Sequence, residues 1–134
     1  MASTLKINTL AGVSTAGSIA VTGEGNSTTT NLQQGLCKQW VAFDMTDQSI
    51  GDSFNTTSVT DVSSGNSLVT IANDFANIHY AMGVSGTNSS NGNAFVSMSG
   101  VTPTVTTYRL GGYLSNDTNM DIDQVKSICS GDLA

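Results

Sequence analysis

From residue 37 onward, hydrophobic and polar positions alternate in short segments that clusters of Gly, Asn, Asp and Ser separate. Val, Ile, Thr and aromatic residues dominate these segments, and such side chains suit a pleated, half-buried surface. Segments recurring at a spacing of roughly 10 to 13 residues are typical of an antiparallel β-sandwich. The seven predicted strands are 37–45, 49–60, 67–72, 78–85, 94–99, 104–110 and 120–129.

The first 36 residues follow a different pattern. Short apolar pieces around 5–7 and 19–21 predict extended segments joined by glycine turns. Leu32 and Leu36 are four residues apart, which predicts a short helical turn capped by Thr30 or Asn31. Two isolated strands and one helical turn are marginal in water, so this region needs neighbouring copies for support. We therefore expect an N-terminal stem over 1–36 and a β-sandwich head over 37–134.

The first predicted strand of the head is apolar on both faces. Trp40 and Ala42 alternate with Val41 and Phe43, whereas a strand with one wet face carries polar residues at every second position. Val41 and Phe43 are expected to face the core, and Trp40 another surface such as a copy of the chain. The alternative is that Trp40 is partly exposed or lies under a loop, because isolated exposed apolar side chains are common.

The composition excludes several classes of protein. Ser, Thr, Asn and Gly make up 18, 18, 12 and 14 of the 134 residues, while only 10% are charged. Four basic against ten acidic residues give a net charge of -6, which would repel a nucleic-acid backbone. No apolar run approaches the roughly 18 residues of a membrane span, so membrane insertion is not expected either.

Neither the cysteines nor the acidic loops indicate a metal or another cofactor. Cys37 and Cys129 could form one disulfide or remain two free thiols, and neither is expected to be essential for stability. A zinc centre needs about four closely spaced ligands, and His79 is the only histidine. The Asn-Asp-rich loop 115–121 supplies oxygen ligands but lacks the spacing of an EF-hand.

The chain also lacks a convincing catalytic motif. The run Gly51-Asp52-Ser53 has no nucleophile-elbow context, and His79 lies in a predicted strand. Asp121 and Asp123 could bring two carboxylates together, although alternating acids on a strand are more simply a solvated surface. We therefore expect a non-enzymatic protein.

A polar tract over 86–93 is rich in neutral hydrogen-bonding groups. Such a loop can recognise a glycan or a protein without much charge, and its simpler interpretation is an ordinary solvated hairpin loop. The candidate receptor-contact residues are Thr87, Asn88, Ser89, Ser90, Asn91 and Asn93.

Three stretches resemble a known family. They are TTTNLQQGLCKQWVAFD (28–44), IGDSFNTTSVTDVSSGNSLVTI (50–71) and ANDFANIHYAMGVSG (72–86). Together they resemble the C-terminal region of tail-fibre-like proteins of tailed, especially marine, bacteriophages, and STLKINTL with GSIAVTGEG resembles the segment that precedes it. The resemblance covers most of the chain and is strongest over 19–85, whereas the final SGDL matches only loosely.

The resemblance implies a virion structural protein, a homotrimer that contributes to host attachment. Closed symmetry would then bury Ile19, Val21, Leu32, Leu36 and Trp40 against their copies. The partners implied are other virion proteins and a host-surface glycan or protein. The alternative is a capsid decoration or head-fibre protein that stabilises or extends the shell. Family members often end much longer fibres, whereas here the sandwich is predicted to begin about 36 residues into the chain.

The N-terminal sequence bears on localisation. It contains one lysine and no unbroken apolar stretch, so it does not have the pattern of a secretory signal. The chain is therefore expected to be made in a cytoplasm without a leader. With the resemblance, this implies localisation to a virion assembled in the host cytoplasm.

Overall fold

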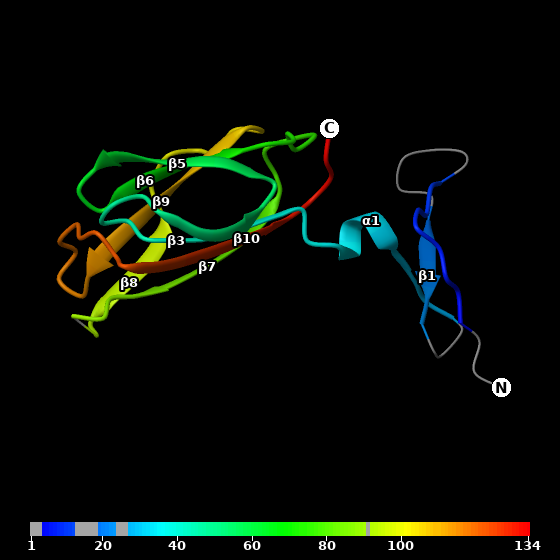
Figure 1. Cartoon of the computed structure of the whole chain (residues 1–134), viewed down its shortest axis with the longest axis horizontal. Coiled ribbons are helices and arrows are strands. Elements are labelled where there is room, and N and C mark those ends of the chain that lie inside the picture. The colour runs from blue at the N-terminus through cyan, green and yellow to red at the C-terminus, as the bar shows by residue number, and fades with distance from the viewer. Residues whose placement is uncertain (1–3, 13–18, 24–26, 91) are drawn as a thin grey trace. The chain divides into compact units, whose positions relative to one another are not determined.

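The computed structural model describes residues 4–12, 19–23, 27–90 and 92–134. The chain divides into two compact units, Met1–Leu36 and Cys37–Ala134 (Figure 1). We call them the N-terminal unit and the sandwich unit. None of the helices in the described ranges is long and apolar enough to cross a bilayer.

The described residues of the N-terminal unit form two short strands and one helical turn. Strand β1 (Ala20–Thr22) pairs antiparallel with β2 (Thr29–Asn31), and β2 runs directly into the four-residue helix α1 (Leu32–Gly35). The Asn31 side chain accepts a hydrogen bond of 3.1 Å from the Gln34 backbone N–H, which caps the helix. The structure therefore has a helical turn at the predicted place, and of the two predicted caps, Thr30 and Asn31, it is Asn31 that caps the turn. Residues 5–7 belong to no strand.

The sandwich unit consists of two four-stranded antiparallel sheets, which confirms the all-β prediction. The first sheet has the order β4 (Ile50–Phe54), β3 (Gln39–Phe43), β10 (Gln124–Ser130), β7 (Ala81–Thr87). The second sheet has the order β5 (Thr56–Ser63), β6 (Asn66–Ile71), β9 (Thr107–Leu114), β8 (Ala94–Met98).

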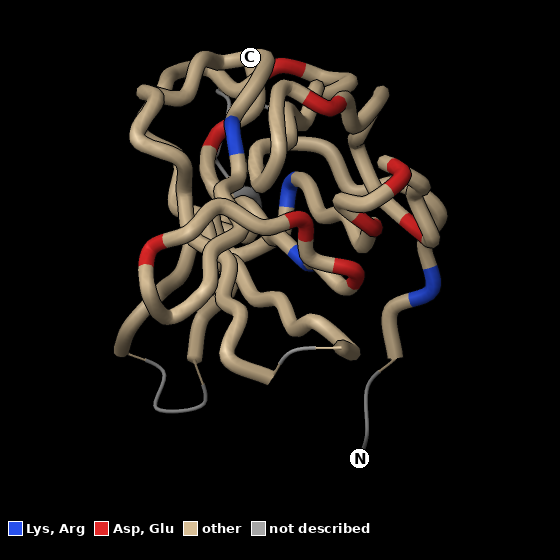
Figure 2. The backbone as a smooth tube through the Cα atoms, turned by 90° about the vertical axis from the view of Figure 1, so that its left-hand side faces the viewer, with Lys and Arg blue, Asp and Glu red and all other residues tan. Residues whose placement is uncertain are grey.

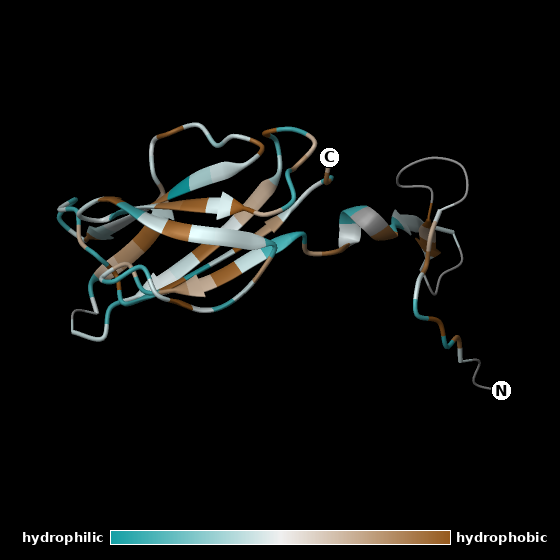
Figure 3. Ribbon diagram, turned by 45° about the horizontal axis from the view of Figure 1, so that its top comes forward, coloured by the Kyte–Doolittle hydropathy of each residue, from teal (hydrophilic) through white to brown (hydrophobic). Residues whose placement is uncertain are grey.

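The hydrophobic core comes from every second residue of the facing strands. In β3, Val41 and Phe43 are buried while Ala42 is only half-buried, and β6 and β10 show the same alternation. Figure 3 shows this alternation as hydrophobic and polar bands along the strands. Each fully buried large apolar side chain stabilises the fold by about 1.5–3 kcal/mol. The core residues are Val41, Phe43, Met45, Val59, Val69, Ile71, Phe75, Tyr108, Leu110, Ile122, Val125 and Cys129.

Three of the differences between predicted and observed strand boundaries change the architecture or exceed three residues. The predicted strand 49–60 is two strands in different sheets, because Asn55 between them has a positive φ of 55°. Strand β9 runs on through Gly111 and Gly112 to Leu114, although these glycines were predicted to start a turn. A Cβ at Gly112 would collide with the Met120 carbonyl oxygen, so a glycine is required there for packing within the strand. Strand β10 begins at Gln124, because residues 120–123 form a connection instead.

Asn55 fixes the corner between the two sheets, and its replacement gives the first prediction. Its side-chain amide donates to the carbonyl oxygens of Lys38 (2.9 Å) and Asn73 (3.1 Å), and its Oδ1 accepts from the Asn73 backbone N–H (2.7 Å). Asn55→Ala should lower the free energy of unfolding by about 1–2 kcal/mol, because it loses these bonds and disfavours the positive φ.

Chemical denaturation checks this prediction, with Asn55→Gly as the control. Glycine tolerates the positive φ but also lacks the side-chain bonds. A variant Asn55→Gly as stable as the parent would show that the side-chain bonds contribute nothing.

Candidate functional site

The polar tract after β7 is anchored by one buried residue. Asn88 is only 7% exposed, its amide donates to the Asp121 carbonyl oxygen (3.2 Å), and its Oδ1 accepts from the Ser90 backbone N–H (2.9 Å). Asn88 therefore holds the loop in place, and its prediction as a receptor contact is corrected. The reason is that a buried amide must satisfy its own hydrogen bonds within the protein.

Asp123 holds the same loop from the other side. Its two carboxylate oxygens accept from the Ser89 backbone N–H at 3.1 and 3.0 Å, and the Ser89 hydroxyl also bonds to it. These hydrogen bonds, that of the hydroxyl first, lower the pKa of Asp123. These bonds hold Asn88, Ser89 and the Ser90 backbone in place. Thr87, Ser89, Ser90 and Asn93 are exposed, while Asn91 lies outside the described residues.

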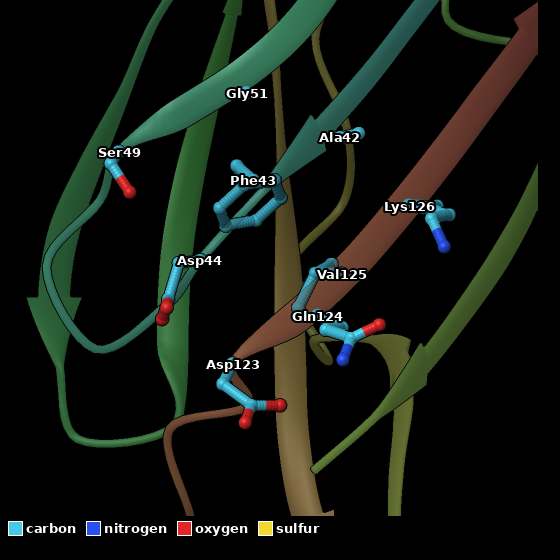
Figure 4. Close-up of a pocket in the computed structure, with 9 residues that line it drawn as sticks. All are labelled: Ala42, Phe43, Asp44, Ser49, Gly51, Asp123, Gln124, Val125 and Lys126. Carbon is cyan, nitrogen blue, oxygen red and sulfur yellow. The ribbon is translucent and has the colours of Figure 1, made fainter. Parts of the chain in front are cut away.

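Beside this loop anchor, the first sheet carries a shallow hollow of about 240 Å³. Figure 4 shows the carboxylates of Asp44 and Asp123 at one end of the hollow and the Lys126 side chain at the other. Figure 2 shows that acidic positions outnumber basic ones along the chain, so a positive group is scarce on this protein. The two ends of the hollow therefore carry side chains of opposite charge. Its lining residues are Ala42, Phe43, Asp44, Ser49, Gly51, Asp123, Gln124, Val125 and Lys126.

The residues weighed for catalysis have other contacts. The Asp121 carboxylate accepts a 2.6 Å hydrogen bond from the Gly65 backbone N–H, so Asp121 and Asp123 each bind a different loop. His79 is exposed, and its backbone N–H donates to the Asn77 side chain at 2.8 Å. Within the described ranges, no group of three His, Cys, Asp or Glu side chains is placed to hold a metal ion.

The side chains predicted to form an oligomer interface lie in both units. In the N-terminal unit, Val21 and Leu36 are exposed, while Ile19 and Leu32 are half-buried. In the sandwich unit, Trp40 is half-buried on the outer face of the first sheet, where Phe54 and Ile128 pair with it from the two neighbouring strands. In the single chain Trp40 is therefore partly exposed, as the alternative interpretation predicted.

Phe54 and Ile128 were not identified as interface candidates from the sequence. Their exposure depends on the strand register, which places both on the outer face beside Trp40. One signal in the sequence could have identified Ile128. Val125, Ser127 and Cys129 alternate with Lys126 and Ile128, so if the first set faces the core, the second set faces outward.

The two cysteines are free thiols. Cys129 is buried in the core, while Cys37 is half-buried, and its thiol donates to the carbonyl oxygen of Gln39 at 3.2 Å. Burial raises the pKa of Cys129 to about 12, and it raises the pKa of Tyr80 to about 12 as well. The folded protein therefore keeps both groups neutral well above neutral pH.

This arrangement predicts a loss of stability in alkali. The unfolded groups ionise at their ordinary pKa values of 9.0 and 10.0, whereas the folded groups resist ionisation up to about 12. Their contribution is therefore complete below about pH 9 and declines as the pH rises toward 12. Thermal unfolding followed from pH 7 to 11 should show a Tm that falls above pH 9. The Tm of the variant Cys129→Ala should fall less steeply over the same range. Equal slopes for the two proteins would contradict the assignment to Cys129.

Comparisons with protein-family models, with curated proteins and with solved structures find no match to this chain.

Proposed function

We propose that the chain is a non-enzymatic bacteriophage virion protein of tail-fibre type, a homotrimer that contributes to host attachment. The sequence resemblance described above motivates the family, and the two-unit organisation supports a division of labour. In this proposal the N-terminal unit assembles the copies and the sandwich unit presents loops to the host.

Exposed apolar side chains in the N-terminal unit carry the assembly part of the proposal. Leu5, Ile7, Leu10, Val21 and Leu36 are all exposed, with Leu5 reaching 77%. The described residues of this unit form one three-residue strand pair and one helical turn, and regular structure of that extent buries too little apolar surface to be stable alone. Packing these side chains against copies of the chain supplies the missing burial.

The anchored loop after β7 supports the attachment part. Hydrogen bonds of Asn88 and Asp123 fix the backbone at its start, so the exposed Ser89 beside Asn88 is presented with little freedom left to lose on binding. Neutral groups of this kind suit a glycan or protein surface that is recognised through hydrogen bonds.

Localisation on the particle tests the proposal. Gold-labelled antibody against the chain should decorate the tails of particles made by the genome that encodes it. Label confined to the capsid would instead favour the decoration or head-fibre alternative, and particles without label would contradict a virion role.

A cell-binding assay tests the loop. Thr87→Ala combined with Ser90→Ala should weaken binding of the fluorescent protein to host cells by about thirtyfold, since the two substitutions together remove two hydrogen bonds that contribute about 1 kcal/mol each. Thr102→Ala, which alters an exposed threonine in another loop, is the control. Equal binding by all variants would remove this loop from the attachment surface.

A further inference from the structure

The outer face of the first sheet carries an apolar row that crosses all four strands. Phe54 pairs with Trp40, Trp40 with Ile128, and Ile128 with Gly83, so all four positions lie at one level on one face. Phe54 is 54% exposed and Ile128 50% exposed. A Cβ at Gly83 would lie 3.3 Å from Ile128 Cγ2, so the isoleucine side chain extends the row over the edge strand β7. We call Phe54, Trp40, Ile128 and Gly83 the apolar row.

A second row on the same face carries charges of opposite sign. Asp52 and Lys126 both pair with Ala42, which lies between them, and Lys126 also pairs with Ser85 on the edge strand. In the part of the chain that the structure describes, neither the Asp52 carboxylate nor the Lys126 ammonium forms an ion pair. We call Asp52, Ala42, Lys126 and Ser85 the charged row.

These two rows restrict how copies of the chain can meet. A rotation about an axis parallel to the strands does not change the height of a residue along that axis. Each row of one copy therefore lies at the same height as the same row of the next copy and faces it. The apolar rows then pack together, and the charged rows face one another. Asp52 belongs to the edge strand β4, so it approaches the opposite edge of the next copy, where Ser85 lies on the edge strand β7 and Lys126 on the neighbouring strand β10. The face is therefore complementary in charge to itself.

Shape follows the same pattern. In the apolar row the large Phe54 lies on one edge strand and Gly83, which has no side chain, lies on the other. A threefold arrangement brings the β4 edge of one copy beside the β7 edge of the next, so a large side chain meets a small residue. Trp40 and Ile128, on the central strands, lie nearest the axis.

We propose that the outer face of the first sheet is the surface through which three sandwich units pack about a threefold axis running along the strands. This inference rests on the proposed trimer and adds a second contact surface to that of the N-terminal unit. The apolar row supplies the buried area, and the pair Asp52–Lys126 between copies sets the level at which the strands align.

Trp40 is the only tryptophan of the chain, so its fluorescence reports on this face directly. In the assembled full-length protein, acrylamide should quench Trp40 weakly. Asp52→Lys places two positive charges in each charged row. It should weaken self-association by about tenfold and raise the quenching constant toward that of an exposed tryptophan. The double variant Asp52→Lys/Lys126→Asp restores opposite charges. It should restore both the strength of self-association and the low quenching constant.

Asp61→Lys is the matched control, because Asp61 is an exposed aspartate on β5, the edge strand of the other sheet. It makes the same change in net charge and should leave both the mass and the quenching unchanged. Light scattering on the same samples separates the two proposals. A trimer in which Asp52→Lys changes neither the self-association nor the quenching of Trp40 would overturn the packing face and leave the trimer standing. A folded monomer would overturn both.

Discussion

Gly65→Ala should lower the free energy of unfolding by about 3–4 kcal/mol. Gly65 has a φ of 70°, and a Cβ there would lie 2.6 Å from the Met120 backbone nitrogen and 2.7 Å from the Gly112 carbonyl oxygen. The left-handed conformation costs alanine about 1–2 kcal/mol, and overpacking adds about 1–3 kcal/mol. The colliding atoms are backbone atoms of β9 and of the segment before β10, so they cannot rotate away.

The turn at Gly65 also holds two hydrogen bonds that such a shift would disturb. The Gly65 N–H donates to the Asp121 carboxylate at 2.6 Å, and the Gly112 N–H donates to the Gly65 carbonyl oxygen at 2.8 Å. Urea denaturation at one fixed protein concentration measures the effect. Gly100→Ala is the matched control, because a Cβ there meets nothing within 4 Å. Two variants that unfold within about 0.5 kcal/mol of each other would contradict the account of this turn.

Tyr108→Phe should cost about 2–3 kcal/mol of stability. Tyr108 is buried in the second sheet, and its hydroxyl donates to Gln39 Oε1 at 3.0 Å and lies 2.7 Å from Ser127 Oγ, both in the first sheet. Removing the hydroxyl leaves two buried polar groups of the opposite sheet without this partner, and each such loss costs about 1–3 kcal/mol. Burial also raises the pKa of Tyr108 well above its ordinary value, so the phenol stays neutral.

A double-mutant cycle with Ser127→Ala measures the coupling between the two sheets. The double variant should be more stable than the sum of the single losses predicts, by about 1 kcal/mol, because both changes remove the same bond. Tyr80→Phe serves as the control, since its hydroxyl bonds the Thr104 carbonyl oxygen at 3.0 Å in an exposed setting. Additive losses, or an equal loss from Tyr80→Phe, would contradict a buried network that joins the sheets.

Strand positions were predictable from the sequence because the alternation of side chains encodes them. Val41 and Phe43 face the core as expected, and six of the seven predicted segments each correspond to one strand. The break at Asn55 was not predicted, because a single asparagine within a run of strand-forming residues gives no periodic signal. Its positive φ is stabilised by tertiary bonds to Lys38 and Asn73, which a local pattern does not contain.

Candidate site residues were less predictable, because their roles depend on contacts between distant segments. Asn88 and Asp121 are 33 residues apart in the chain and bond directly, which makes Asn88 an anchor rather than a contact residue. In the same way, Phe54 and Ile128 join Trp40 only through the strand register. The polar character of the loop could be predicted from composition, whereas the division between anchoring and exposed residues required the fold.

The mass of the full-length chain in solution tests the central claim of this account most directly. Light scattering at micromolar concentration should give three times the chain mass of 13.8 kDa, because the proposed trimer covers the exposed apolar side chains of the N-terminal unit and the outer face of the first sheet with copies of the chain. A stable, well-folded monomer at that concentration would contradict the account.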